Sequence, residues 1–159
     1  MKRIVEFKQL YEDVITPTKA KDGDACWDLY VHSVERESDK FVLVHTGLCI
    51  LPPKGYSGSV KPRSSHTKTD WCLLNSPAVI DQYTGEWMFR FRAFPVDIEW
   101  EQEDDGSPYL YLGYPLFPYQ KGDRFAQFEF HKIEDFQLVN VDELSPTDRG
   151  SGGFGSTGK

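Results

Sequence analysis

The sequence predicts a single all-β domain with the architecture of a sandwich, a jelly roll or a small barrel. Apolar and polar residues alternate with period two in many short runs, as expected for strands that are buried on one face. The ten prolines and thirteen glycines fall mainly between those runs, where they favour turns. No window sustains a helical 3.6-residue period over three turns. At 159 residues the chain is long enough for one well-packed domain and too short for two.

Five runs carry the clearest strand pattern. In chain order they are Trp27–Val31, Phe41–His45, Trp87–Arg92, Tyr109–Leu112 and Phe125–Phe130. Turn residues separate them, for example at Pro52–Gly55 and Gly106–Pro108. Many short strands joined by Gly/Pro turns are typical of antiparallel all-β folds.

Residues 97–119 interrupt this even spacing. An acidic stretch at 99–105 is followed by an aromatic, proline-rich stretch at 109–119, and we interpret the whole as an insertion. One interpretation is a solvated loop with an extra strand that covers a sheet edge. The other is a hairpin that binds a protein partner, because exposed aromatic residues bordered by charge are typical of interfaces.

Composition excludes several classes of function. A net charge of -7 and a pI of about 5.1 argue against a nucleic-acid polymer as partner, since binding a polymer requires many phosphates to be neutralised. No apolar run approaches the length of a membrane span, and the N-terminus lacks a signal-peptide core, so we expect a soluble cytoplasmic protein without a membrane partner. The three cysteines, at 26, 49 and 72, predict neither a disulfide framework nor a zinc site.

The C-terminal residues 149–159 contain five glycines, three hydroxyl side chains, one aromatic ring and a cation at each end. Such a tail is either a disordered linker or a flexible arm whose N–H groups, hydroxyls and cations bind a polyphosphate. Residues 153–159 match the start of a P-loop pattern, but that motif needs a preceding strand and a following Ser/Thr and helix. We therefore reject a P-loop here.

Four further segments combine polar residues with strand ends: 24–29, 61–65, 75–86 and 122–127. Each has an ordinary structural explanation when taken alone. Asp28 is explained by a structural ion pair, Pro62–Ser64 by a turn, Asp81 by a hairpin cap and Gly122–Arg124 by a hairpin loop.

Together with the tail and in this order, the segments resemble the five signature motifs of the homotrimeric dUTPase family. The resemblance extends from about residue 24 to residue 159. It implies a dUTPase-like jelly roll, or β-clip barrel, spanning residues 1–148, with residues 149–159 as a flexible glycine-rich arm. It also implies a homotrimer whose active sites lie between subunits and are closed by a neighbour's arm. The implied reaction is hydrolysis of dUTP to dUMP and pyrophosphate with Mg²⁺.

The resemblance assigns catalysis and metal contact to two carboxylates. Asp81 matches the catalytic base that orients and deprotonates the attacking water, a role that a carboxylate fills once a metal polarises the phosphates. Asp28 matches the acid that meets Mg²⁺ through its water shell, as suits an ion that keeps several of its waters.

The remaining motif residues match substrate contacts. Ser64, with the N–H groups of Ser64 and Ser65, and Gln127 match the phosphate-binding set. Arg63 belongs to the same turn, where we expect that it, like Arg124, holds carboxylates and backbone in place. In the arm, Arg149, Ser156 and Thr157 match contacts to the γ-phosphate, and Phe154, followed by Gly155, matches the ring that stacks on uracil.

Specificity is assigned to the hairpin at 75–86. Asn75 and nearby backbone match the groups that bind the uracil edge, so that cytosine would leave buried groups unpaired. Tyr83 matches the ring that lies against the deoxyribose and excludes a 2′-hydroxyl.

The chain departs from the family pattern in the first and third motifs. Cys26 and Ala78 replace glycines. The Asp81–Gln82–Tyr83 stretch is one residue shorter than the usual pattern with two acids, which predicts either a bulge or a shorter hairpin turn. Asp81 aligns with either the first or the second acid; we choose the first, because Val79 and Ile80 preserve its apolar approach.

Two other functions compete with hydrolysis of dUTP. A dCTP deaminase shares the Arg-Ser-Ser turn, but it uses a glutamate after the hairpin glycine where this chain has residues 88–90, Met-Phe-Arg. A regulatory binding protein of the same fold would keep the nucleotide pocket, hydrolyse weakly and bind a protein through residues 97–119.

Overall fold

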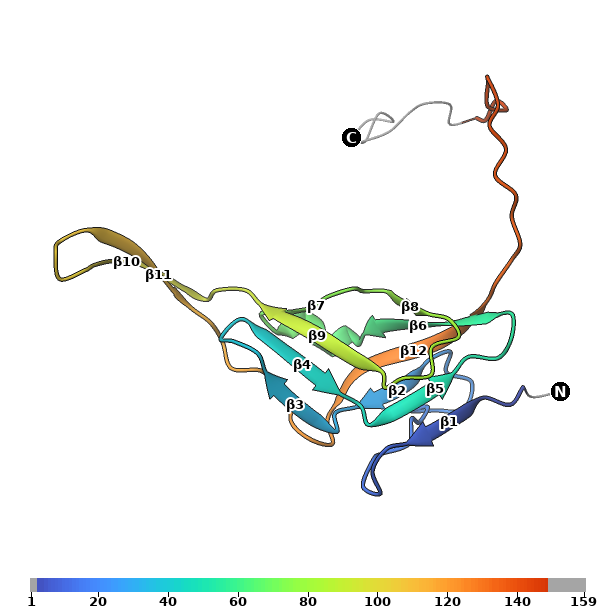
Figure 1. The fold of residues 1–159 in the computed structure, drawn as a ribbon, viewed down its shortest axis with the longest axis horizontal. Coiled ribbons are helices and arrows are strands. Elements are labelled where there is room, and N and C mark those ends of the chain that lie inside the picture. The colour runs from blue at the N-terminus through green and yellow to red at the C-terminus, as the bar shows by residue number, and fades with distance from the viewer. Residues whose placement is uncertain (1–2, 149–159) are drawn as a thin grey trace.

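The computed structural model describes residues 3–148 of the chain. These residues contain twelve β-strands and one short 3-10 helix (Figure 1). The 3-10 helix is η1 (Ser64–Lys68). The all-β prediction is therefore confirmed. No helix in these residues is long and apolar enough to cross a membrane.

Two four-stranded antiparallel sheets build the domain. The first has the order β2-β12-β6-β8, with β2 (Trp27–Tyr30), β12 (Arg124–Lys132), β6 (Tyr56–Pro62) and β8 (Ala78–Ile80). The second has the order β3-β4-β9-β7, with β3 (Ser33–Arg36), β4 (Phe41–His45), β9 (Met88–Ala93) and β7 (Trp71–Leu73).

The core lies between these sheets because each strand presents alternate residues to the inside. On β9, Phe89, Phe91 and Ala93 are buried, while the residues between them are exposed. Phe89 and Phe91 of the second sheet pack on Phe125 of the first, with ring centroids 5.7 and 6.0 Å apart. Leu29 and Val60 are fully buried in the same cluster. The period-two runs of the sequence thus mark the inner faces.

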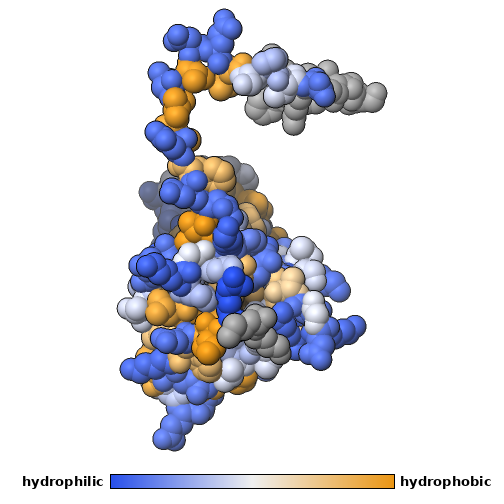
Figure 2. Space-filling view, turned by 90° about the vertical axis from the view of Figure 1, so that its right-hand side faces the viewer, coloured by the Kyte–Doolittle hydropathy of each residue, from blue (hydrophilic) through white to orange (hydrophobic). Residues whose placement is uncertain are grey.

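Two smaller ribbons complete the strands. The pair β1 (Glu6–Gln9) and β5 (Leu48–Leu51) is antiparallel and lies beside the sandwich (Figure 1). The pair β10 (Asp97–Gln102) and β11 (Pro108–Gly113) projects away from it. After β12 the chain leaves the body as an extended segment, which rises from the domain in Figures 1 and 2 with apolar side chains on its surface.

Candidate active site

Four of the expected phosphate-site residues come together in a hollow of ≈ 320 Å³. Its lining includes Asp28 from β2, Gln127 from β12, and Arg63 and Ser64 from the turn after β6. The sheet explains this meeting, because Asp28 lies directly opposite Gln127 in the β2–β12 ladder and Gln127 lies opposite Lys61 in the β12–β6 ladder. We call this cavity the phosphate hollow.

Asp28 is the buried charge of the phosphate hollow, with 7% of its surface exposed. One carboxylate oxygen accepts a bond from Arg63 Nε at 3.0 Å and the other from Arg124 Nη1 at 3.1 Å. Burial of a carboxylate is tolerated when it is paired in this way. Asp24 also lines the hollow, so two carboxylates stand against the two guanidinium groups and the region has no net positive charge.

The turn that carries Ser64 is supported from inside by a buried histidine, which the sequence analysis missed. His66 is 7% exposed, and its Nδ1 lies 2.9 Å from the Tyr119 hydroxyl. Burial lowers the pKa of His66 and raises that of Tyr119. Ser65 lies beside Ser64 in the chain but does not line the phosphate hollow. His66 directly follows the hydroxyl pair Ser64 and Ser65 in the sequence, and nothing in that pattern indicates that its side chain is buried.

A second hollow, of ≈ 610 Å³, is lined by Asn75, Asp81 and Tyr83 together with backbone and side chains of β8 and β9. We call it the nucleoside hollow. Asn75 and Gln82 adopt left-handed backbone angles, with φ of 55° and 48°. Asparagine tolerates this region more readily than most residues, and the two reversals turn the chain on either side of β8.

Asp81 directly follows β8, which ends at Ile80. Its side chain is exposed, and within residues 3–148 no hydrogen bond or ion pair engages its carboxylate. The left-handed Gln82 follows at once, so the shortened motif is accommodated in a turn rather than by a bulge in the strand.

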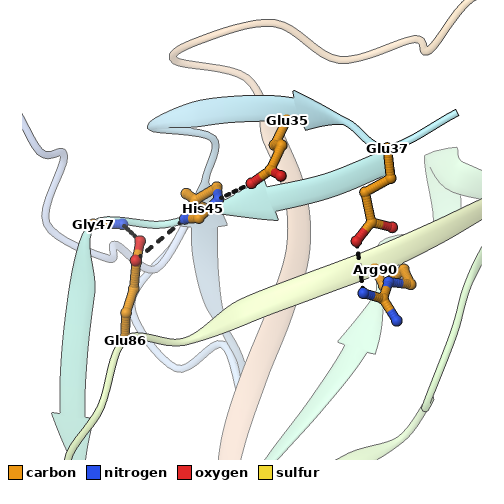
Figure 3. A network of polar contacts seen from close by, with 6 residues as sticks. All are labelled: Glu35, Glu37, His45, Gly47, Glu86 and Arg90. Carbon is orange, nitrogen blue, oxygen red and sulfur yellow. Dashed lines mark hydrogen bonds and ion pairs between the residues drawn. The ribbon is translucent and has the colours of Figure 1, made fainter. Parts of the chain in front are cut away.

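The end of this hairpin, at Glu86 and Trp87, is held by the end of β4 and the loop between β4 and β5 (Leu48–Leu51). Glu86 accepts a hydrogen bond from the Gly47 N–H at 2.7 Å and lies 3.2 Å from His45 Nδ1 (Figure 3). The Thr46 hydroxyl donates to the Trp87 carbonyl at 2.7 Å. Glu86 is the last residue of the segment 75–86, but the sequence alone assigns it no role. Its pairing with residues 45–47 is long-range and has no signature in the sequence.

The two hollows lie at opposite ends of strand β6. Gly58 pairs with Ile80, so Asp81 continues past the start of β6, whereas Arg63 and Ser64 follow its end. Six residues of strand separate these ends by about 20 Å. One chain therefore does not bring Asp81 and Ser64 around the same small ligand.

The arm residues expected to bind substrate, Arg149, Phe154, Gly155, Ser156 and Thr157, lie outside the described residues. The segment before them, 133–148, exposes large apolar side chains. Phe136, Leu138 and Leu144 are 81%, 98% and 87% exposed.

Comparison with known proteins identifies the family. The family model described as dUTPase matches residues 114–158. A deoxyuridine 5′-triphosphate nucleotidohydrolase of Clostridioides difficile is 34% identical over 157 residues, which cover 97% of this chain and 97% of the relative. The chain belongs to the dUTPase family. A second dUTPase relative, from Clostridium kluyveri, is 35% identical and covers 95% of each chain.

Solved dUTPase structures share the fold. The dUTPase of Staphylococcus bacteriophage 80alpha with dUPNHPP matches 99% of this chain and 100% of its own, with a TM-score of 0.75 and 22% identity. A mutant dUTPase from phage phi11 of S. aureus, described with a structural Mg(II) ion, matches 91% of this chain and 100% of its own, with a TM-score of 0.66 and 21% identity. The dUTPase fold expected from the motifs is thus confirmed.

The described side chains of the phosphate hollow offer few direct ligands for Mg²⁺. In residues 3–148 no three His, Cys, Asp or Glu side chains cluster as metal ligands. Both oxygens of Asp28 already contact guanidinium groups, although each oxygen has a second lone pair that can accept a bond from a metal-bound water. Mg²⁺ commonly takes few protein ligands and is bound through substrate phosphates and water.

Proposed function

We propose that this dUTPase family member hydrolyses dUTP to dUMP and pyrophosphate. The observation that carries the proposal is the unengaged carboxylate of Asp81, which borders a hollow lined by Asn75 and Tyr83. A carboxylate without a partner is able to accept the proton of the attacking water. The deoxyuridine moiety would occupy the nucleoside hollow, with uracil against Asn75 and the sugar against Tyr83.

The phosphate hollow supplies binding and orientation rather than a base. Arg63 and Arg124 hold Asp28 in place, while the Ser64 hydroxyl and the Gln127 amide would provide donors for phosphate oxygens. Mg²⁺ bound to the triphosphate would polarise the α-phosphate and neutralise developing charge. Asp28 would face its water shell.

We propose further that the complete site forms between copies of the chain in a homotrimer. The separation of about 20 Å along β6 supports this, because Asp81 of one copy must then meet Ser64 of another. The apolar segment 133–148 supports it too, since its side chains are exposed in the single chain and would be buried on a neighbour. The arm of residues 149–159 would then close over the nucleotide, with Phe154 on uracil.

Mixing two impaired variants tests the shared site. The Asp81→Asn and Asp28→Asn proteins are each measured for release of pyrophosphate from dUTP with Mg²⁺, then unfolded together and refolded as mixed trimers. Because each site would need one intact half from each variant, turnover should return to about a quarter of the wild-type value. No recovery in mixed trimers would overturn the shared site. Wild-type protein that releases no pyrophosphate would overturn hydrolysis itself, and ammonia released from dCTP would favour the deaminase.

A second candidate function, binding of a regulatory protein, rests on the β10–β11 ribbon. The register places Ile98 opposite Leu112 and Trp100 opposite Leu110, so these four apolar side chains share one face. All are exposed, Trp100 by 74%. Residues 97–113 also contain six acids and no Lys or Arg, which favours a partner with an apolar surface bordered by basic residues.

Site-specific cross-linking tests this function. A photoreactive residue at position 100 should attach to a partner protein in cells of the source organism, because it lies on the apolar face. The same residue at position 101, on the opposite face, is the matched control. Equal cross-linking from both positions would contradict docking through the apolar face.

A further inference from the structure

We infer that His45 is a positioning residue for the nucleoside hollow: its imidazole holds Glu86, and Glu86 holds the hairpin that carries Asp81 and Tyr83. The inference rests on the proposed hydrolysis of dUTP and adds to it a residue outside the five motifs.

His45 lies between two carboxylates that come from different elements (Figure 3). Its Nδ1 is 3.2 Å from Glu86 Oε2, and its Nε2 is 3.5 Å from Glu35 Oε2 on strand β3. The histidine side chain is 24% exposed and that of Glu86 is 15% exposed. The contact with Glu86 is therefore the better shielded of the two and the stronger candidate for a structural effect.

Glu86 connects this histidine to the wall of the nucleoside hollow. Its second oxygen accepts a bond from the Gly47 N–H, so the carboxylate joins the β4–β5 loop to the end of the hairpin. Glu86 itself lines the nucleoside hollow. A change in its position moves the lining directly.

Gly85 transmits the position of Glu86 to Tyr83. A Cβ built on Gly85 would overlap the Tyr83 hydroxyl oxygen, so the tyrosine ring lies against the glycine backbone. The ring can keep its place only while the 85–86 backbone keeps its own. His45 thus acts on the expected sugar contact through two packed neighbours, without touching the ligand.

The groups that face His45 identify Glu86 as its main partner. Glu35 and Glu86 face it, and the nearby cation Arg90 contacts Glu37 at 2.6 Å instead (Figure 3). Across the ladder on β9, His45 is opposite the uncharged Met88. An N–H at Nδ1 can donate to Glu86. Removal of that donor should therefore loosen the end of the hairpin.

Three variants separate this role from a merely structural one. His45→Asn keeps an amide N–H near the Nδ1 position. His45→Leu removes the donor. His131→Asn is the matched control, because His131 contacts Glu129 at 3.2 Å at the end of β12 and lines neither hollow. The KM and kcat for dUTP with Mg²⁺ are measured for each protein and the wild type under the same conditions.

We expect His45→Leu to raise KM for dUTP about fivefold, as loss of one hydrogen bond would do, with kcat changed less than KM. His45→Asn should restore most of that loss. His131→Asn should match the wild type in both constants.

Equal KM values for His45→Leu and His45→Asn would overturn the inference while leaving hydrolysis of dUTP intact. A wild-type protein that does not hydrolyse dUTP would overturn both. If His45→Leu does not fold, Glu86→Gln takes its place, because it keeps the shape of the side chain and weakens the contact with His45. A KM equal to that of the wild type in this variant would then overturn the inference.

Discussion

The phosphate hollow and the nucleoside hollow differ in how their carboxylates are used. The phosphate hollow is built on regular ladders between β2, β12 and β6. Its carboxylate, Asp28, forms ion pairs with two arginines. The nucleoside hollow is built on a hairpin with two left-handed residues, and the carboxylate of Asp81 is unengaged within residues 3–148. A paired carboxylate positions its surroundings, whereas a free one is able to accept a proton.

This contrast is an arrangement of charge as well as of backbone. Two arginines pair with Asp28, whereas in the described part of the chain no cation pairs with Asp81. Separate hollows allow one to bind strongly while the other keeps a reactive group, because each is stabilised by its own contacts.

The largest effect should come from removing the free carboxylate. Asp81→Asn preserves the size of the side chain and removes the base, so kcat for dUTP should fall about 10³-fold, within the range for loss of a positioned base. KM and the thermal midpoint should change little, since Asp81 supports no described contact. Full activity in this variant would show that another group accepts the proton, and the contrast between the hollows would fail.

Removal of the arm should have the next largest effect. A chain that ends at Asp148 should lose about 10²-fold in kcat/KM, because the ligand would stay open to water and lose the contacts of Arg149 and Phe154. The mass of the assembly, measured by sedimentation, should correspond to a trimer in both forms. Normal turnover in the truncated protein would remove the arm from the proposed site.

Replacing the paired carboxylate should, besides impairing turnover, lower the stability of the fold. Asp28→Asn leaves Arg63 and Arg124 without their acceptor, and the free energy of unfolding should fall by about 2 kcal/mol in urea titrations. Asp39→Asn is the control, because its pair with Arg36 lies at the exposed surface and contributes little. Equal midpoints for the two variants would mean that the Asp28 pairs do not stabilise the phosphate hollow.

The smallest predicted effect is the acid sensitivity of the turn after β6. Burial lowers the pKa of His66 in the folded state, so the unfolded chain binds this proton more readily. Its contribution to stability is then present above the unfolded pKa and is lost as the pH falls through the folded pKa. Stability measured from pH 7 down to pH 5 should decline less steeply in His66→Gln than in the wild type. Parallel curves would contradict this.

The sequence predicted the regular half of the molecule better than the irregular half. The strand expected at Phe41–His45 matches β4, and that expected at Phe125–Phe130 lies within β12, because alternation reports directly which face of a strand is buried. The meeting of Asp28 with Ser64 and Gln127 was expected from the motifs. The roles assigned to these residues remain predictions.

The contacts of the hairpin could not be predicted in the same way. Glu86 pairs with residues about forty positions away, and His66 contacts Tyr119, the last residue of the segment 97–119. Neither pairing follows from a local period or a turn signal, since each depends on how two elements meet in space. Within the shortened motif, the sequence left open a bulge or a shorter turn, and the left-handed backbone of Gln82 decides for the turn.

The base of the β10–β11 ribbon has a consequence for how this protein diversifies. Val96 donates to the Gly113 carbonyl at 2.9 Å, so the ribbon enters and leaves the sandwich at neighbouring points. A segment whose ends already meet can be exchanged for another of different length without altering the framework around it. Related chains are therefore free to gain, lose or swap this module by recombination, acquiring a new specificity while their chemistry is inherited unchanged.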